Sequence, residues 1–295
     1  MLLDNYSTGF KRYALYEKEI TPKSTREILN TTIYLFKYTG VVNPKDITIN
    51  NVRDYLYSKK EERLWSPRTF RNQRQYLKTF FDYCLHHQFI KENPVSKISK
   101  PKLPKTLPRF LTKNQLQKII LGTELFSWRH EKEKVRNRAL IYTFIHTGIR
   151  LNELLNLKLE DVNMEDKEIL IKRGKGRKER IVPIHNNLYT VLQTYLQQRK
   201  KSNYDSEWFF QSLRAATKMT AKTVHTICKK ISERCGEYFT PHNLRHAFAR
   251  GLVNEGVGLY LVKELLGHTS ISTTEIYLSV SKESLRKSFC HVELL

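Results

Sequence analysis

A basic, proline-rich stretch in the first half of the chain constrains the fold more than any other feature. It reads NPVSKISKPKLPKTLPR over residues 93–109, and it holds four prolines, four lysines and one arginine but no acidic residue. Proline disfavours helix and biases the preceding residue towards extended backbone. We therefore predict an extended basic linker over residues 93–110, for which an ordinary solvated hinge is the plainer interpretation. It divides the chain into a domain over 1–92, a second domain over 111–280 and a tail over 281–295.

The charge of the chain indicates what it binds. Its 52 Lys and Arg residues outnumber 29 Asp and Glu residues, which gives a formal net charge of +23. An excess of this size favours a polyanionic partner, most often nucleic acid. Membrane attachment is the rival explanation, but no apolar run approaches the roughly 18 residues of a spanning helix, and the N-terminus lacks a signal-like apolar core. We expect a cytoplasmic protein without membrane attachment.

The cysteines give no sign of a metal site. The four cysteines lie far apart without a Cys-x-x-Cys pair, and the arginines beside the histidines of residues 242–268 would repel a cation. We expect neither a metal nor another cofactor.

The first domain has the pattern of a helical, DNA-binding module. Thr21-Pro22 and Ser66-Pro67 are typical helix starts, because proline is harmless at the first helical position. After Ser66, apolar residues recur at spacings of three, four and seven. The basic residues between them are Arg68, Arg71, Arg74 and Lys78. This basic face either lies against a DNA backbone or simply faces solvent, and the overall charge favours DNA. We expect the linker to contact phosphates through Lys100, Lys102 and Lys105.

The second domain combines helices with one hairpin. A capping-box pattern at Thr112 and Gln115 opens one helix, and an apolar helix over 138–146 ends near Gly148. The segment EILIKRGKGRKERIVPI, residues 168–184, predicts two short strands around a basic, glycine-flanked turn. The fold class is therefore mainly α, with a helical N-terminal domain and a mixed α/β second domain that carries a small sheet. The hairpin residues expected to bind DNA electrostatically are Arg173, Arg177, Lys178 and Arg180.

Several residues of the second domain could carry chemistry on a phosphodiester. Arg150 follows a Thr-Gly turn and opens a helix, where a guanidinium and helix N-terminal amides both favour a phosphate. His242 and Arg245 share one helical face near a helix start. Lys175 projects from the hairpin turn. Each signal is weak by itself, and with 16 tyrosines in the chain any one tyrosine is more often a packing residue.

Four stretches together carry a resemblance to a known family. They are HTGIRLNELLNL at 146–157, RGKGRKERIVPI at 173–184, TPHNLRHAFARGLVNEGV at 240–257 and LLGHTSISTTEIY at 265–277. In order and spacing they resemble the tyrosine recombinase (phage integrase) family, and most of all its short Xer-like members. The catalytic set that this resemblance implies is Arg150, Lys175, His242, Arg245, His268 and Tyr277, with Glu153 as an accessory residue.

The resemblance also implies a reaction. Tyr277 attacks the scissile phosphate of double-stranded DNA and forms a 3′-phosphotyrosyl enzyme with a free 5′-hydroxyl, and the 5′-hydroxyl of a partner strand reverses the step. The family acts as a homotetramer on two DNA sites, and a sister recombinase as a further partner stays open. Ser272 and Glu275 predict a capped helix carrying Tyr277. One departure is Leu278-Ser279, where many members carry Thr-His.

Alternatives remain at this point. A catalytically inactive DNA-binding protein of the same fold would keep binding without cleavage, and a relaxing topoisomerase would nick and reseal one duplex. The target sequence and the biological role are also open: chromosome-dimer resolvase, plasmid resolvase or mobile-element integrase. The tail carries an apolar stripe at Leu285, Phe289 and Val292, which either docks into a neighbouring subunit or packs on its own domain.

Overall fold

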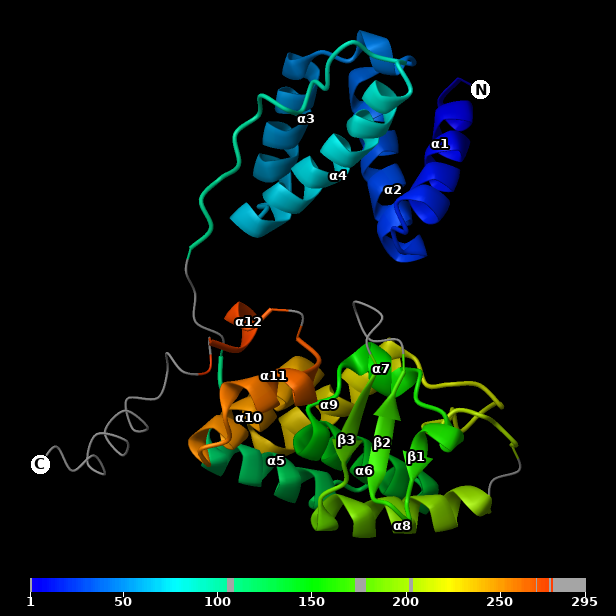
Figure 1. Ribbon diagram of the computed structural model, residues 1–295, viewed down its shortest axis with the longest axis vertical. Helices are drawn as coiled ribbons and strands as arrows, with labels where there is room; N and C mark the ends of the chain where they lie inside the picture. Colours follow the sequence, from blue (N-terminus) through cyan, green and yellow to red (C-terminus); the bar gives the residue numbers. More distant parts are fainter. Residues whose placement is uncertain are drawn as a thin grey trace, which may run out of the picture. The chain divides into compact units, whose positions relative to one another are not determined.

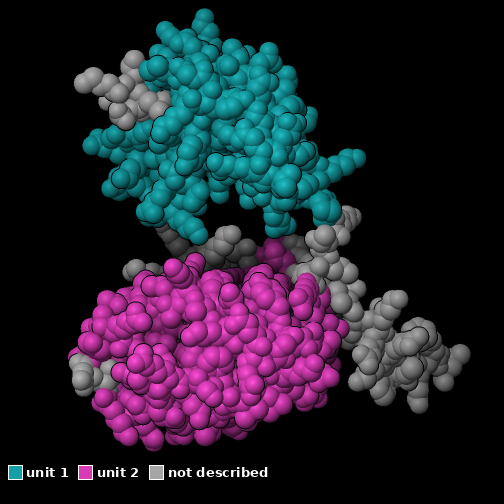
Figure 2. All heavy atoms as spheres, turned by 180° about the vertical axis from the view of Figure 1, so that it is seen from behind, with its two compact units in different colours: residues 1–106 teal, residues 107–295 magenta. Residues whose placement is uncertain are grey.

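The computed structural model describes residues 2–104, 109–172, 179–201, 204–268, 270–275 and 277. The chain forms two compact units, residues 1–106 and residues 107–295 (Figure 1, Figure 2). Within the described ranges, no helix combines the length and the apolar character needed to cross a bilayer. The sequence predictions that fall outside the described residues concern Lys105, Arg173, Lys175, Arg177, Lys178 and the tail 281–295.

Regular structure in the described part of unit 1 is helical. Its elements are α1 (Leu2–Arg12), the π-helical turn η1 (Tyr13–Glu17), α2 (Pro22–Thr39), the short helix η2 (Pro44–Asp46), α3 (Ile49–Glu62) and α4 (Pro67–His86). Both predicted helix starts are confirmed. The Thr21 hydroxyl accepts from the Ser24 amide at 3.2 Å, and the Ser66 hydroxyl accepts from the Thr69 amide at 3.1 Å. These caps satisfy amides that have no partner inside the helix.

The core of unit 1 lies where α2 packs against α3 and α4. Leu35, Leu56, Leu77 and Phe80 are completely buried there, together with Phe10 of α1. Burying a side chain of this size contributes roughly 1.5–3 kcal/mol of hydrophobic free energy. The regularly spaced apolar residues of α4 therefore form the face that packs against its neighbouring helices.

One residue of the predicted basic face belongs to this core. Arg74 is only 4% exposed, and its guanidinium donates from Nε to the Ile98 carbonyl at 2.6 Å and from Nη2 to the Val95 carbonyl at 3.0 Å. The prediction that Arg74 contacts DNA is wrong. Four residues after Phe70, it shares the buried face of α4. By contrast Arg68 is exposed and Arg71 is half-buried.

The same contacts change the picture of the linker. Val95 and Ile98 are buried in the core of unit 1, and the Asn93 side chain donates to the Lys78 carbonyl at 3.1 Å. Residues 93–98 thus pack against α4 and do not run as an extended linker. Lys100 and Lys102, which follow, are exposed. Lys78 itself forms an ion pair with Asp82 at 2.6 Å.

Unit 2 is mostly helical with a small sheet, so the predicted fold class is confirmed. Its helices are α5 (Lys113–Leu125), α6 (Glu131–Thr147), α7 (Leu151–Leu155), the short helix η3 (Leu159–Asp161), α8 (Asn186–Lys200), α9 (Ala221–Cys235), α10 (Pro241–Asn254), α11 (Leu259–Leu266) and α12 (Ser272–Glu275). Its strands are β1 (Val162–Asn163), β2 (Glu168–Ile171) and β3 (Arg180–Pro183).

The sheet has the antiparallel order β1-β2-β3. In the predicted hairpin Ile169 pairs with Val182 and Leu170 with Ile181, which places Ile169, Ile171 and Val182 on the buried face. The two-residue strand β1 was not predicted, because two residues are too few to show an alternating pattern. The hairpin turn between β2 and β3 lies outside the described residues.

Helix α6 is the centre of unit 2. Its residues Ala139, Leu140, Ile141 and Phe144 are completely buried, and α5, α8 and α10 pack around it (Figure 1). A separate small cluster joins α10 to α11 through Ala249, Val253, Val262 and Leu266, and it includes Tyr277. This arrangement places the C-terminal end of α6 beside α10 and α11.

Candidate active site

The turn after α6 sets the position of Arg150. Gly148 ends α6 in the left-handed conformation with φ 58°, and its amide donates to the Phe144 carbonyl. Only glycine reaches this conformation without strain. A Cβ on Gly148 would also collide with the ring of Phe248 on α10. The chain then leaves the turn with Arg150 as the residue that opens α7.

A buried carboxylate holds Arg150 in place. Arg150 Nη1 lies 2.7 Å from Glu153 Oε1, and Arg180 Nη2 of β3 lies 2.7 Å from Glu153 Oε2. Burial alone would raise the pKa of Glu153, but hydrogen bonds and charge from Arg180 and Arg150 outweigh it and lower that pKa to about 2. Arg180 Nε also donates to the Leu265 carbonyl at 2.8 Å. Glu153 of α7 and Arg180 of β3 therefore connect α7, β3 and α11 and hold the Arg150 side chain.

Arg245 is the most buried charged group of the site, at 3% exposure. Its Nη1 donates to the Gly148 carbonyl and its Nη2 to the Leu266 carbonyl, both at 2.6 Å. Burial, and to a smaller extent Arg150, lowers the pKa of Arg245 to about 9, so this guanidinium stays charged at neutral pH. Arg150 in turn donates to the Gly267 carbonyl at 2.7 Å. The two arginines meet at the turn between α11 and His268.

The two predicted histidines lie at this junction. His242 stands in the first turn of α10, which Thr240 caps by accepting from the Asn243 amide. Partial removal of its ring from water, together with Arg245 and Arg150, lowers the pKa of His242. His268 follows Gly267, and its Nδ1 lies 2.9 Å from the Thr274 hydroxyl. Burial, then Arg245 and Arg150, lowers the pKa of His268 to about 4, so it is neutral at neutral pH.

Tyr277 lies beside the same groups, but in a different local structure from the predicted one. Helix α12 ends at Glu275, and the Tyr277 amide donates to the Thr274 carbonyl at 3.0 Å in a turn. The prediction that Tyr277 sits on the helix is therefore wrong. Its side chain is 2% exposed. Burial raises the pKa of Tyr277, while the charges of Arg245 and Arg150 oppose that rise.

The structure thus brings together Arg150, Glu153, Arg245, His268 and Tyr277, with His242 beside them. Lys175 lies outside the described residues. Two cationic groups and neutral histidines around one turn can bind an oxyanion and stabilise charge that develops on it. Among the described residues, no group of three or more His, Cys, Asp or Glu side chains could hold a metal ion.

Two residues of the site were missed or misassigned. His246 had no predicted catalytic role, yet its Nδ1 lies 2.8 Å from the Tyr277 hydroxyl. Its position four residues after His242, on the same helical face, was a signal that could have found it. Arg180 was expected on DNA with the hairpin, and this is wrong, because its side chain is 9% exposed and paired with Glu153.

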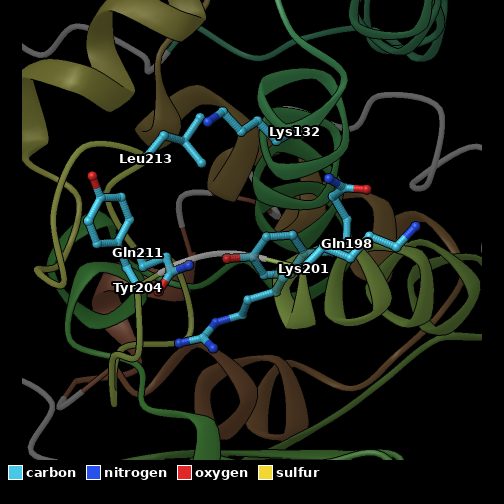
Figure 3. A pocket seen from close by; sticks show the side chains of 8 residues that line it. Lys132, Gln198, Lys201, Tyr204, Gln211 and Leu213 are labelled. Carbon is cyan, nitrogen blue, oxygen red and sulfur yellow. The ribbon is translucent and has the colours of Figure 1, made fainter.

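A separate cavity lies away from these residues. It measures about 240 Å³, and its lining includes Lys132, Lys201 and Gln211 (Figure 3). Arg199 also lines it. None of the predicted catalytic residues lines it. Both Arg199 and Gln211 have a buried polar atom without a hydrogen-bond partner in the described structure.

Known proteins resemble this chain over most of its length. The profile of the phage integrase family matches residues 109–284. The tyrosine recombinase XerC of Oceanobacillus iheyensis is 34% identical, over 97% of this chain and 95% of the relative. The tyrosine recombinase XerA of Pyrococcus furiosus is 33% identical, over 98% of this chain and 95% of the relative.

Solved structures share the fold. A post-cleavage complex of the XerH site-specific recombinase bound to a palindromic difH substrate matches with a TM-score of 0.75 at 24% identity, over 97% of this chain and 84% of that one. A lambda integrase dimer bound to a core site matches with a TM-score of 0.71 at 20% identity, over 94% and 93% of the two chains.

Proposed function

The chain belongs to the phage integrase family and is a site-specific, Xer-like tyrosine recombinase, and we propose that it cuts and rejoins DNA through a phosphotyrosine formed on Tyr277. One observation carries this proposal. Arg150 is anchored on the Gly267 carbonyl and Arg245 on the carbonyls of Leu266 and Gly148, and the charges of both arginines oppose the rise of the Tyr277 pKa. A phosphate bound by these two arginines would have its negative charge neutralised next to the tyrosine.

The residues divide the chemistry of phosphoryl transfer between them. The Tyr277 oxygen attacks the phosphorus, the bond from phosphorus to the 5′-oxygen breaks, and the DNA 3′ end stays on the tyrosine. Arg150, Arg245 and His268 stabilise the charge on the phosphate oxygens, which is most of what this reaction needs. His242 is our proposed acceptor of the phenolic proton, and Lys175 our proposed donor of a proton to the departing 5′-oxygen. The 5′-hydroxyl of another strand then reverses the step.

We propose that unit 1 and the linker assist by holding double-stranded DNA. The net charge of +23 and the accessible side chains of Arg68, Arg71, Lys100 and Lys102 support this role, because cations placed along phosphates release counterions on binding. The active assembly we propose is a homotetramer on two sites in the cytoplasm. It would resolve DNA dimers or integrate and excise a mobile element, alone or with a sister recombinase.

The test begins by finding a target. The full-length protein selects duplexes from a randomised double-stranded pool, and recovered sequences are rebuilt as nicked suicide duplexes that trap a covalent intermediate. We expect an adduct that survives denaturing detergent with the wild type and none with Tyr277→Phe. An adduct on the Phe variant would show that another residue is the nucleophile.

The same duplexes separate the alternatives. A protein that only binds DNA would retain the selected duplex and form no adduct. A topoisomerase would relax a supercoiled plasmid that carries one site and exchange no strands between two sites. We expect strand exchange between two sites, because the chain is a site-specific recombinase.

A further inference from the structure

His246 and Tyr277 form a buried contact that has no part in the proposed mechanism. His246 lies on α10, one turn after His242, and is 8% exposed, while Tyr277 is 2% exposed. The Nδ1 atom of His246 is 2.8 Å from the tyrosine hydroxyl. Among the described residues, this nitrogen is the hydrogen-bond partner of that hydroxyl.

Aromatic rings enclose the pair. Phe110 packs edge-on against both, with ring centroids 5.8 Å from His246 and 5.9 Å from Tyr277. The guanidinium of Arg250 lies 5.4 Å from the centre of the Phe110 ring. The ring centroids of His242 and His246 lie 4.3 Å apart. The Tyr277 ring also belongs to the apolar cluster of α10 and α11, and its hydroxyl contacts His246.

This position does not allow attack on DNA. A nucleophile must bring its oxygen into contact with the phosphorus, and reacting atoms need to approach to about 3–3.5 Å. The Tyr277 side chain is 2% exposed, and its hydroxyl is hydrogen-bonded to His246. The hydroxyl must therefore leave this contact before it can reach a phosphate held by Arg150 and Arg245.

The hydrogen bond decides how firmly the hydroxyl is held. A buried hydroxyl without a partner loses the hydrogen bonds it made to water, so it is stable inside the protein only if another group forms a hydrogen bond with it. Burial, and to a smaller extent the neighbouring His242 and Arg245, lowers the pKa of His246 to about 4. The imidazole is therefore neutral at neutral pH, and in the tautomer that carries its proton on Nε2 the Nδ1 atom is the acceptor for the Tyr277 hydroxyl.

We propose that His246 is a positioning residue, which accepts the hydrogen bond of the Tyr277 hydroxyl and holds the nucleophile in a buried resting position until DNA is bound. This proposal rests on the proposed role of Tyr277 as the nucleophile. It assigns to His246 the retention of the tyrosine, and to His242 the proton transfer at the phosphate.

A chemical accessibility experiment without DNA tests the resting position. The full-length protein is treated with tetranitromethane, and nitration of each tyrosine is followed by peptide mass spectrometry. His246→Phe keeps a ring in the pocket but removes the acceptor, whereas His246→Asn offers an uncharged oxygen near the position of Nδ1. Two tyrosines serve as references: Tyr195, which is 3% exposed and donates to the Phe209 carbonyl, and Tyr16, which is 80% exposed.

We expect Tyr277 to react as slowly as Tyr195 in the wild type. In His246→Phe its nitration should accelerate about tenfold, the factor that follows from losing one buried hydrogen bond of ordinary strength. His246→Asn should stay near the wild-type rate. Continued protection of Tyr195 shows that unit 2 is folded, and His246→Leu replaces the Phe variant if Tyr195 becomes reactive.

Two results would overturn the proposal. One is a Tyr277 that stays as protected in His246→Phe as in the wild type while Tyr195 is also protected. The other is a wild-type Tyr277 that reacts as fast as Tyr16, because the buried position would then not be the resting one.

A second measurement links the position to the reaction. With saturating suicide duplex in a single turnover, we expect His246→Phe to form the covalent adduct about tenfold faster than the wild type, with unchanged DNA affinity and with His246→Asn near the wild-type rate. A slower adduct in His246→Phe would mean that His246 serves the attack and not the resting state, which contradicts the proposal. If even the wild type forms no adduct, the proposed function fails, and the nitration experiment still decides the role of His246.

Discussion

At the scale of single residues, two buried arginines join segments that lie apart in the sequence. Arg74 and Arg180 were both expected on DNA, yet Arg74 donates to backbone carbonyls of residues 95 and 98 and Arg180 pairs with Glu153. Carbonyl, carboxylate and phosphate oxygens are all acceptors that suit a guanidinium. Which of them an arginine meets depends on the segments packed around it, so residue type alone could not decide.

The buried pair of Arg180 and Glu153 gives a test at this scale. We expect Arg180→Met to lower the free energy of unfolding by about 3 kcal/mol, because it leaves a buried carboxylate with one partner fewer. Urea unfolding of the full chain measures this. The matched control is Lys97→Met, whose ion pair with Glu92 is exposed at both ends and should change stability by less than about 0.5 kcal/mol. Equal effects of the two substitutions would mean that the ion pair between Arg180 and Glu153 does not stabilise the fold.

At the scale of elements, the boundaries of helices followed from short-range signals. The caps at Thr21, Ser66 and Thr112 were predicted from residues within three positions of one another, and the structure confirms them. The glycine that ends α6 was also predicted, but its close approach to the Phe248 side chain was not. Gly148 touches α10 through Phe248, a contact between segments about one hundred residues apart in the sequence, which no local pattern reports.

Substitution of two glycines with the same backbone conformation distinguishes the cost of backbone strain from the cost of a steric clash. Gly148 and Gly236 have φ values of 58° and 70°, and a Cβ on Gly236 would meet nothing within 4 Å. We expect Gly236→Ala to destabilise by about 1 kcal/mol through backbone strain. Gly148→Ala should cost about 3 kcal/mol, because α10 must also shift. Thermal or urea unfolding of both variants compares them, and equal losses would exclude a crowded contact at Phe248.

At the scale of the whole molecule, burial keeps three histidines neutral at two separate places. It lowers the pKa of His146, His246 and His268 to about 4, and the neighbouring charges that add to this effect are His185 at His146, His242 and Arg245 at His246, and Arg245 and Arg150 at His268. Their ordinary value is 6.5. Between these two values the unfolded chain binds protons that the folded chain does not, so stability rises with pH in this window.

Stability should therefore fall as the pH drops from about 6.5 to about 4. Urea unfolding, followed by fluorescence of Trp128 and Trp208 in a Trp65→Phe background, measures the free energy of unfolding at each pH. These three histidines should contribute about three protons to the slope of that free energy against pH, expressed in units of 2.303RT. His146→Gln should reduce the slope by about one proton, because His146 lies outside the site. Midpoints that do not depend on pH in this range would contradict the assignment of neutral, buried histidines.

Assembly of the proposed tetramer is the other property of the whole molecule. The tail 281–295 lies outside the described residues, and its apolar stripe was predicted from sequence alone. We expect deletion of residues 281–295 to leave binding to a single DNA site unchanged and to weaken the pairing of two sites, because a neighbouring subunit would lose its docking segment. Native gel electrophoresis with one-site and two-site DNA measures both. Normal recombination by the truncated protein would show that the tail does not join subunits.

The helix caps, the hairpin, the basic charge and the order of the motifs follow from the amino-acid sequence alone, because they depend on residues within a few positions or on composition. The anchoring of Arg245 on Gly148, 97 residues away, depends instead on how the helices pack. The same holds for the burial of Tyr277 against His246, 31 residues away. Such contacts form when α6, α10 and α11 pack together, and a buried polar group takes its partner from whatever that packing brings near.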